Sequence, residues 1–459
     1  MTVSLLLATL VLVADPTPQI GPKFANAPSA ATRASNQSWW TRFADPELNT
    51  LVTRGTGNNF SVLAARSRIE EADAVVAQQL SPLLPTATWD TSLTTGPLDS
   101  LGFQFGAGGS SSGGAMGAPV DVPDLYWQAS SAVNVGLAID ITGKNVLGHR
   151  AAKDDRKAAK HDVDVQRQSL ASQITGTYYD LVTSRAQLAI TQEQVETNER
   201  LLELTQLKFD AGQANAVDVL QQRQQVAASK VQVPRAERQL RAFEQRMAVL
   251  LGETPGQSFQ TPSTLPTLPA RPGVGAPSEL LRARPDLRAQ AQRVEATEKR
   301  TKVSKRSFAP DLRLSAKGGV QAINVGEWSN QGFWSATATL SVPLSTGGST
   351  YGRMRQAKAQ QRTATRNLSQ STLNAVQEVE DALLLETRQV EVLVLYKEQH
   401  AAAKAAFEES RTRYAEGVAE YLPVLTALAS LQRAELDIVT AHRDLIAARI
   451  DLYTALGDR

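Results

Sequence analysis

The sequence has no cysteine among its 459 residues, so disulfides, thiolate metal sites and a cysteine nucleophile are excluded. No apolar run approaches the roughly 18 residues that a membrane-spanning helix needs. Neither sign of charge is in large excess, with 48 Lys and Arg against 46 Asp and Glu. A nucleic-acid-binding protein would normally carry a basic excess, so this balance argues against that class.

Patterns that indicate catalysis are also missing. The sequence contains no GxSxG, Walker A or HExxH motif. Its four histidines are dispersed and lack partners at helical spacing, which gives no metal site. We therefore expect no enzymatic activity and no metal or cofactor.

The most apolar segment lies near the start of the chain, from Val3 to Ala14. Its length suits the hydrophobic region of a signal peptide, although no Lys or Arg precedes it. We interpret residues 1–14 as an export signal; a chance apolar start or a misassigned start is the alternative. Residues 15–57 are expected to form an N-terminal segment with a short helix.

One plan occurs twice in the sequence, at an offset of about 205 residues. KFDAGQANAVDVL, which begins at Lys208, matches RYAEGVAEYLPVL, which begins at Arg413. A second match pairs VNVGLAIDITGKNVLGHRAAK with ATATLSVPLSTGGSTYGRMRQAK. This period is far longer than that of a solenoid, so it indicates a duplication. We place the first repeat at 58–252, a linker at 253–277 and the second repeat at 278–459.

Each repeat predicts a helix followed by two strands. The two helices, 58–80 and 284–308, end at steps that contain proline, where a helix cannot easily continue. The segments that follow are short, partly alternating and long enough to cross a bilayer at a tilt. The expected membrane strands are 84–95, 130–142, 310–321 and 334–345. The connection between the first two contains the flexible tract FGAGGSSSGGAMG.

Two very long helices come next, at 146–208 and 351–415. Each would be about 95 Å long, too long for a compact domain, so it must belong to a bundle, a coiled coil or a tube. Returning helices follow at 216–251, which Pro234 should kink, and at 420–456.

The last helix offers a narrow seam to a neighbouring helix. It consists of residues at 4-3-4 spacing, namely Leu445, Arg449, Leu452 and Leu456. A hollow tube needs only such seams between neighbouring helices, so this composition favours a tube over a solid bundle.

These features, together with PSELLRARPDLRAQAQRVEA from Pro277, make the chain resemble the outer membrane efflux protein family of TolC-like and OprM-like channels. The resemblance runs from Ser38 to the C-terminal LYTALG. It implies an α+β membrane protein of a Gram-negative outer membrane, in which a homotrimer builds a 12-stranded β-barrel from four strands per protomer. The barrel would continue into a long periplasmic α-helical barrel. Closure through the trimer would also pair the strand edges that lipid does not tolerate.

The resemblance further implies a function in transport. The trimer would give small molecules, such as drugs, toxic compounds or metal ions, passive exit from a tripartite efflux pump. Its partners would be a periplasmic adaptor, an inner-membrane pump of the resistance-nodulation-division type, and outer-membrane lipid. A type I protein secretion duct is the alternative within transport, and a non-membrane coiled-coil scaffold is the alternative outside it.

The resemblance places the functional residues at the two helix reversals. Gly212 and Gly417 would form the reversals that contact the adaptor, where glycine permits a positive φ. The residues of the periplasmic tip or gate would be Phe209, Asp218, Gln221, Tyr414, Glu420, Pro423 and Thr426.

The tip departs from the family pattern in its charges. Asp218 also fits a helix-capping box with Asn215. In the second repeat, Pro423 occupies the position that matches Asp218, and Thr426 replaces an acid. Ala419 stands where a TolC-like arginine would be. We therefore doubt a charge-locked gate and expect contacts of Phe209 and Tyr414 to matter more.

One acidic run lies on a long helix, from Gln377 to Asp381. We interpret it as a solvated outer face of that helix and not as a ring that lines the channel.

Overall fold

The computed structural model describes residues 21–26, 38–97, 125–324 and 328–458. The expected export signal and the glycine-serine tract lie outside these residues. The chain divides into two compact units, of which one contains residues 1–69, 157–292 and 365–459 and the other contains 70–156 and 293–364. Each unit therefore draws on both repeats, because the long helices pass from one unit into the other.

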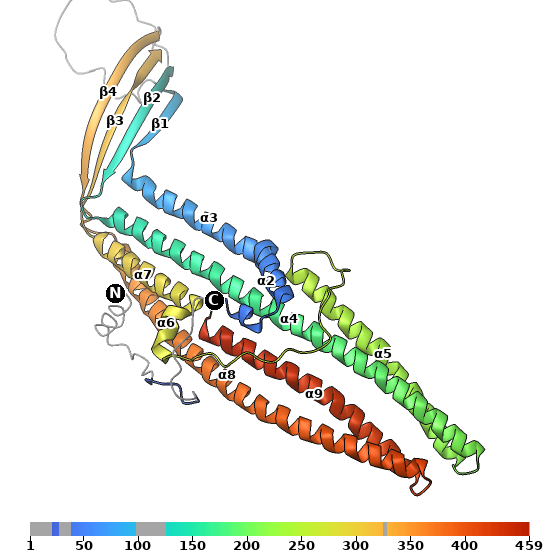
Figure 1. The fold of residues 1–459 in the computed structure, drawn as a ribbon. Coiled ribbons are helices and arrows are strands. Elements are labelled where there is room, and N and C mark those ends of the chain that lie inside the picture. Colours follow the sequence, from blue (N-terminus) through green and yellow to red (C-terminus); the bar gives the residue numbers. More distant parts are fainter. Residues whose placement is uncertain (1–20, 27–37, 98–124, 325–327, 459) are drawn as a thin grey trace, which may run out of the picture. The chain divides into compact units, whose positions relative to one another are not determined.

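The second unit contains one antiparallel sheet in the order β1-β2-β3-β4 (Figure 1). Its strands are β1 (Thr86–Pro97), β2 (Leu125–Ile139), β3 (Asp311–Asn324) and β4 (Trp328–Ser341). The four strands of the predicted fold class are present. The second pair runs further into the segment between 321 and 334 that was expected to connect it. β4 also ends before the predicted 345, since Pro343 has no N–H to donate to a ladder.

The register of the sheet separates two faces of different chemistry. One cross-strand row contains Trp89, Val133, Gly318 and Trp334. The adjacent row, on the opposite face, contains Thr88, Asn134, Lys317 and Ser335. Trp89 on β1 and Trp334 on β4 are 77% and 83% exposed within the chain. Such large apolar side chains would be unfavourable on a sheet face that met water. One face is thus apolar and aromatic, and the other is polar.

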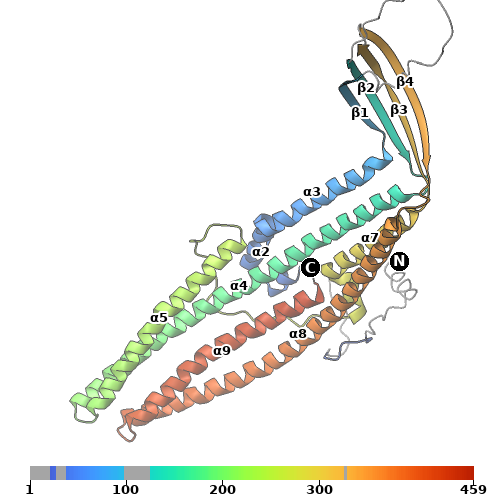
Figure 2. The same ribbon diagram turned by 180° about the vertical axis from the view of Figure 1, so that it is seen from behind.

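Long helices make up most of the rest of the chain (Figures 1 and 2). α4 (Lys144–Asp210) and α8 (Ser349–Ala415) have 67 residues each, which corresponds to about 100 Å. The returning helices are α5 (Ala216–Leu250) and α9 (Tyr421–Leu456). α5 continues through Pro234 as one helix. The seam of α9 is confirmed, because its four residues are all buried.

Shorter helices complete the described chain. They are η2 (Trp39–Phe43), α2 (Pro46–Asn58), α3 (Phe60–Leu80), η3 (Ser81–Leu83), η5 (Pro277–Glu279), α6 (Leu280–Ala283) and α7 (Pro285–Arg306). None of the helices in the described ranges has both the length and the apolar composition that crossing a membrane requires.

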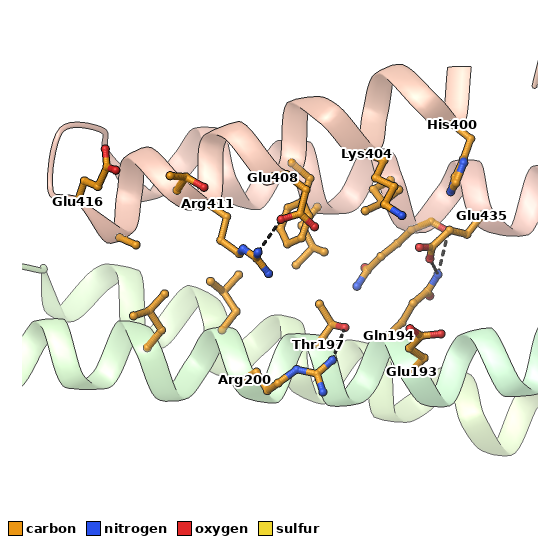
Figure 3. Close-up of a pocket in the computed structure, with 18 residues that line it drawn as sticks. Glu193, Gln194, Thr197, Arg200, His400, Lys404, Glu408, Arg411, Glu416 and Glu435 are labelled. Carbon is orange, nitrogen blue, oxygen red and sulfur yellow. Dashed lines mark hydrogen bonds and ion pairs between the residues drawn. The ribbon is translucent and has the colours of Figure 1, made fainter. Parts of the chain in front are cut away.

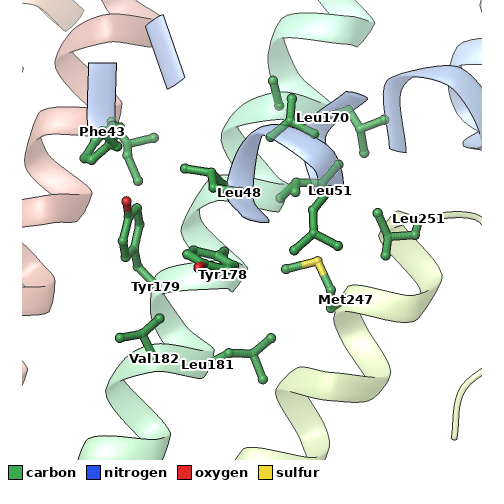
Figure 4. Packing of buried hydrophobic residues seen from close by; sticks show 14 of the residues in the cluster. Phe43, Leu48, Leu51, Leu170, Tyr178, Tyr179, Leu181, Val182, Met247 and Leu251 are labelled. Atoms are coloured by element: carbon green, nitrogen blue, oxygen red, sulfur yellow. The ribbon is translucent and has the colours of Figure 1, made fainter. Parts of the chain in front are cut away.

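The main hydrophobic core of the first unit joins the N-terminal helices to the long ones (Figure 4). The ring of Trp39, fully buried, stacks on that of Tyr453 at 5.6 Å between centroids. The hydroxyl of Tyr178 donates a 2.7 Å hydrogen bond to Asp45, which also caps α2. Burial is the main reason that the pKa of Tyr178 is raised, so this hydroxyl keeps its proton.

The linker between the repeats is held by cations on the helices around it. Arg185 of α4 donates to the carbonyls of Phe259 and Thr261. Arg449 of α9 donates to the carbonyl of Pro269 and also pairs with the buried Glu386 of α8. Arg271 of the linker binds the same carboxylate at 2.5 Å. The linker is therefore fixed to three of the long helices.

The acidic run on α8 is solvated as expected at Gln377, Glu378 and Asp381, which are exposed, but two of its acids also bind other segments. Glu378 pairs with Arg284 at 2.5 Å, and the carboxylate of Glu380 accepts hydrogen bonds from the backbone and the side chain of Asn26. Val379, between them, is fully buried. Two of these acids thus hold other segments against α8, because an arginine and free N–H groups from distant parts of the sequence meet them there.

Candidate functional site: the helix reversals

Both predicted reversals are the same backbone motif. At the end of α4, Gly212 has a φ of 71°, and the N–H of Gln213 donates to the carbonyl of Lys208 at 2.7 Å. At the end of α8, Gly417 has a φ of 79°, and the N–H of Val418 donates to the carbonyl of Arg413 at 3.0 Å. These are Schellman motifs, in which the glycine supplies a left-handed conformation. The conformation alone requires glycine, since no atom lies near the position of a Cβ at either residue.

An aromatic pair lies beside the second reversal. Tyr414 at the end of α8 and Tyr421 at the start of α9 are both buried, and their rings meet edge to face at 5.8 Å. The ammonium of Lys208, from the first hairpin, lies 5.0 Å from the centre of the Tyr414 ring. Burial is the first cause of the raised pKa of both tyrosines. They therefore stay neutral and act through packing and hydrogen bonds.

A chain of buried hydrogen bonds crosses from one helical hairpin to the other. The hydroxyl of Tyr421 donates to the side-chain oxygen of Gln222 on α5. The amide of Gln222 in turn donates to the backbone carbonyl of Asn198 on α4 at 2.7 Å. Asn198 donates to the carbonyl of Gln194 at 2.8 Å. Gln222 and Asn198 are both fully buried, so each link replaces a hydrogen bond that water would otherwise supply.

Sequence reasoning missed this network. Gln222 falls on the buried stripe of α5 between Val219 and Val226, a position where a polar residue needs a partner. That spacing was a usable signal. The partner itself was not predictable from spacing, because Tyr421 is separated from Gln222 by 199 residues.

The predicted tip residues fall into different environments. Tyr414 is buried, whereas Phe209 is 41% exposed and lies outside the aromatic pair. Asp218 and Asn215 form the expected capping box, in which the carboxylate accepts the N–H of Asn215 at 3.1 Å. The structure therefore brings Tyr414, but not Phe209, into the cluster beside the reversals.

The remaining predicted residues lie on the surface near the helix starts. Gln221, Glu420, Pro423 and Thr426 are all exposed. Glu420 precedes α9 without a side-chain capping bond, and the hydroxyl of Thr426 donates to carbonyls of its own helix, 3.0 Å to Pro423 and 3.1 Å to Leu422. These positions are accessible to a partner and take no part in the buried network.

A cleft of about 770 Å³ lies between α4 of the first hairpin and α8 and α9 of the second (Figure 3). Its walls carry charges of both signs. Glu408 pairs with Arg411 at 2.6 Å, and Glu435 accepts a hydrogen bond from Gln194 at 2.9 Å. The lining also includes the apolar residues Leu201, Leu204, Phe407, Leu428 and Leu431. Such a lining suits a protein surface of mixed charge better than a single small ion.

Comparison with known proteins identifies the family. A family model described as outer membrane efflux protein matches residues 52–253 and 276–458. The chain belongs to the outer membrane efflux protein family. The resemblance proposed from the sequence is thereby confirmed.

Individual relatives cover nearly the whole of this outer membrane efflux protein. The pyoverdine export outer membrane protein OpmQ of Pseudomonas aeruginosa is 26% identical over 432 residues, which is 92% of this chain and 87% of OpmQ. The toluene efflux pump outer membrane protein TtgF of Pseudomonas putida is 24% identical, over 93% and 86% of the two chains. The solved outer-membrane channel OprN is 25% identical, with a TM-score of 0.83 over 97% of this chain and 98% of OprN.

These findings confirm the predicted fold class, function and localisation. This efflux protein is an outer-membrane channel of a Gram-negative efflux system, and its helical part lies in the periplasm. The reversals between α4 and α5 and between α8 and α9 belong to that helical part. This localisation rules out the alternative of a non-membrane coiled-coil scaffold.

Proposed function

We propose that three copies of the chain close one water-filled duct, through which small molecules leave a tripartite efflux pump without any chemistry in this protein. The observation that carries this proposal is the two-faced sheet. Its apolar face, with Trp89 and Trp334, suits lipid, and its polar face suits water. The outer edges of β1 and β4 have no partner in the described chain, so closure with neighbouring copies would satisfy them.

We propose further that the reversals at Gly212 and Gly417 meet the periplasmic adaptor, which links the duct to an inner-membrane pump of the resistance-nodulation-division type. The exposed residues beside the reversals and the mixed-charge cleft between the hairpins support this proposal. Val418, which directly follows Gly417 and is 73% exposed, offers an apolar contact at the second reversal.

We propose small molecules as the cargo. Relatives that match over nearly their whole length are named for export of pyoverdine and for toluene efflux. A type I duct for proteins remains the second candidate. The identity of the pump that copurifies with the trimer would separate the two.

We propose that the tip opens when the α8–α9 hairpin moves relative to α4–α5, as in other two-state rearrangements of packed helices. The contacts of Tyr414 and Tyr421 support this role, since they join the two hairpins. Phe209, Asp218, Gln221, Glu420, Pro423 and Thr426 would form the surface around that joint.

The test of the duct is the mass and the conductance of the purified protein. We expect a trimer in detergent and discrete single-channel currents in a planar bilayer. A monomer that gives no current would refute the proposal.

The adaptor contact can be tested by crosslinking, because the chain has no cysteine of its own. Val418→Cys should crosslink to the adaptor in whole cells. Val231→Cys, which is 49% exposed but lies in the middle of α5, is the matched control and should not. Equal crosslinking at both positions would count against docking at the reversals.

A further inference from the structure

The polar face of the sheet carries an uneven set of charges. The charged residues of the described strands all lie on this face, and they are Asp90, Asp311, Arg313 and Lys317. Three of the four belong to β3, where they follow the alternation of a strand. The lipid-facing side of the same strands carries none, as the cost of a charge in lipid requires.

The two acids of this face already have partners. Asp311 at the start of β3 accepts the ammonium of Lys144 at 2.9 and 3.0 Å, which cancels its charge. Asp90 accepts a hydrogen bond from the amide of Asn134 at 2.5 Å and another from Thr88 at 3.3 Å. Both of these donors are neutral, so neither of them offsets the charge of Asp90.

The two cations of this face are placed differently from the acids. No described residue forms an ion pair with Arg313 or with Lys317. The ammonium of Lys317 lies 5.5 Å from the centre of the Phe333 ring, across the β3–β4 pair, and its cross-strand neighbours are Asn134 and Ser335. A cation over an aromatic ring is positioned without being neutralised.

We propose that Arg313 and Lys317 give the lumen of the β-barrel a positive potential, so that the duct favours anionic over cationic solutes. This inference rests on the proposed duct, in which the polar face lines the water. With Asp311 cancelled by Lys144, the described strands of each protomer contribute two cations against Asp90, and the trimer repeats that excess three times around one axis. Rings of charged side chains are a known source of ion selectivity in pores.

The dimensions of such a barrel make the effect measurable. Twelve strands spaced ~4.8 Å apart and tilted by ~40° give a backbone radius of ~12 Å, which long side chains narrow further. The Debye length is ~10 Å in 0.1 M salt and ~3 Å in 1 M salt. The charges of Arg313 and Lys317 therefore reach the axis at low salt and are screened at high salt.

The test is the reversal potential of single trimers in a planar bilayer under a KCl gradient, with chloride and potassium as the probes. In dilute KCl, replacing both cations by Arg313→Gln and Lys317→Gln should lower the permeability ratio of chloride to potassium by roughly twofold or more. Asp90→Asn, on the same face, should raise that ratio. Both changes should fade in 1 M KCl, where screening is strong.

The variants separate failure of this inference from failure of the duct. Lys317→Gln alone keeps Arg313 and is the fallback if the double variant does not give heat-stable trimers. If the variant trimers conduct with the same chloride-to-potassium permeability ratio as the wild type, the inference is overturned and the proposed duct stands. A wild-type protein that never conducts would overturn both.

Discussion

Removing one hydroxyl at the joint between the hairpins should change how often the channel opens. In Tyr421→Phe, the side-chain oxygen of Gln222 loses its donor while the residue stays fully buried. An unsatisfied buried acceptor costs about 1–3 kcal/mol. If the α8–α9 hairpin must move for the tip to open, this cost falls on the closed arrangement alone.

The expected size of the effect follows from that cost. A shift of about 1–3 kcal/mol raises the ratio of open to closed states by roughly 5- to 150-fold. The ring of Phe keeps the edge-to-face contact with Tyr414, so the aromatic packing is largely retained. The measurement is the fraction of time that single channels spend in their high-conductance state.

Two further variants make the result decisive. Gln224→Ala, at an exposed position on the same helix, is the matched control and should not change the open fraction. Tyr421→Phe combined with Gln222→Leu removes both partners and should bring the closed state back toward its original stability. An intact Tyr421→Phe trimer with the wild-type open fraction would refute the reasoning.

Three other predictions concern stability. Burial, followed by the charge of Lys397, lowers the pKa of His442 below its ordinary 6.5, so the unfolded chain binds the proton more readily than the folded one. Thermal stability should therefore fall as the pH drops below about 6.5, and His442→Gln should weaken that pH dependence. Gly319→Ala should reduce the yield of heat-stable trimers, since its Cβ would lie 2.2 Å from a backbone oxygen. Arg284→Lys should lower the free energy of unfolding by about 1.5–3 kcal/mol in denaturant titrations, because a lysine cannot bind two acids and the carbonyl of Ala455 together.

The chain offers matched controls for the last two of these variants. Gly318→Ala changes the residue next to Gly319, but no atom lies closer than 3.9 Å to the position of its Cβ. An equal loss of trimers in both variants would therefore contradict the steric argument. Arg282→Lys, two residues from Arg284, should leave stability nearly unchanged.

Local rules were enough to predict much of the architecture. The long helices follow from the absence of proline, and the reversals at Gly212 and Gly417 follow from the need for a positive φ. The seam of α9 followed from the 4-3-4 spacing of three leucines and Arg449. The ends of β3 and β4 were less accurate, because the segment AINVGEWSNQG has the composition of a loop and is mostly strand in the structure.

The contacts that hold the site together could not be predicted in the same way. Arg284 meets Glu378 from 94 residues away, and Tyr421 meets Gln222 from 199. Each residue alone has an ordinary local explanation, such as a cap or a solvated surface. Only the pairing of hairpins in space decides which polar residues share a buried contact. The role of the tip residues as a gate and the boundaries of the repeats remain predictions.

The anchored linker gives the second hairpin the mechanics of a lever. Arg449 fixes α9 to the linker and to Glu386 near its C-terminal end, whereas Tyr421 lies at the far end of about 40 Å of helix. A pivot of about 5° at the fixed end would carry Tyr421 through roughly 3–4 Å over that length. Such a sweep exceeds the reach of a hydrogen bond, so a slight rotation at the pinned root would be amplified into a complete break at the tip.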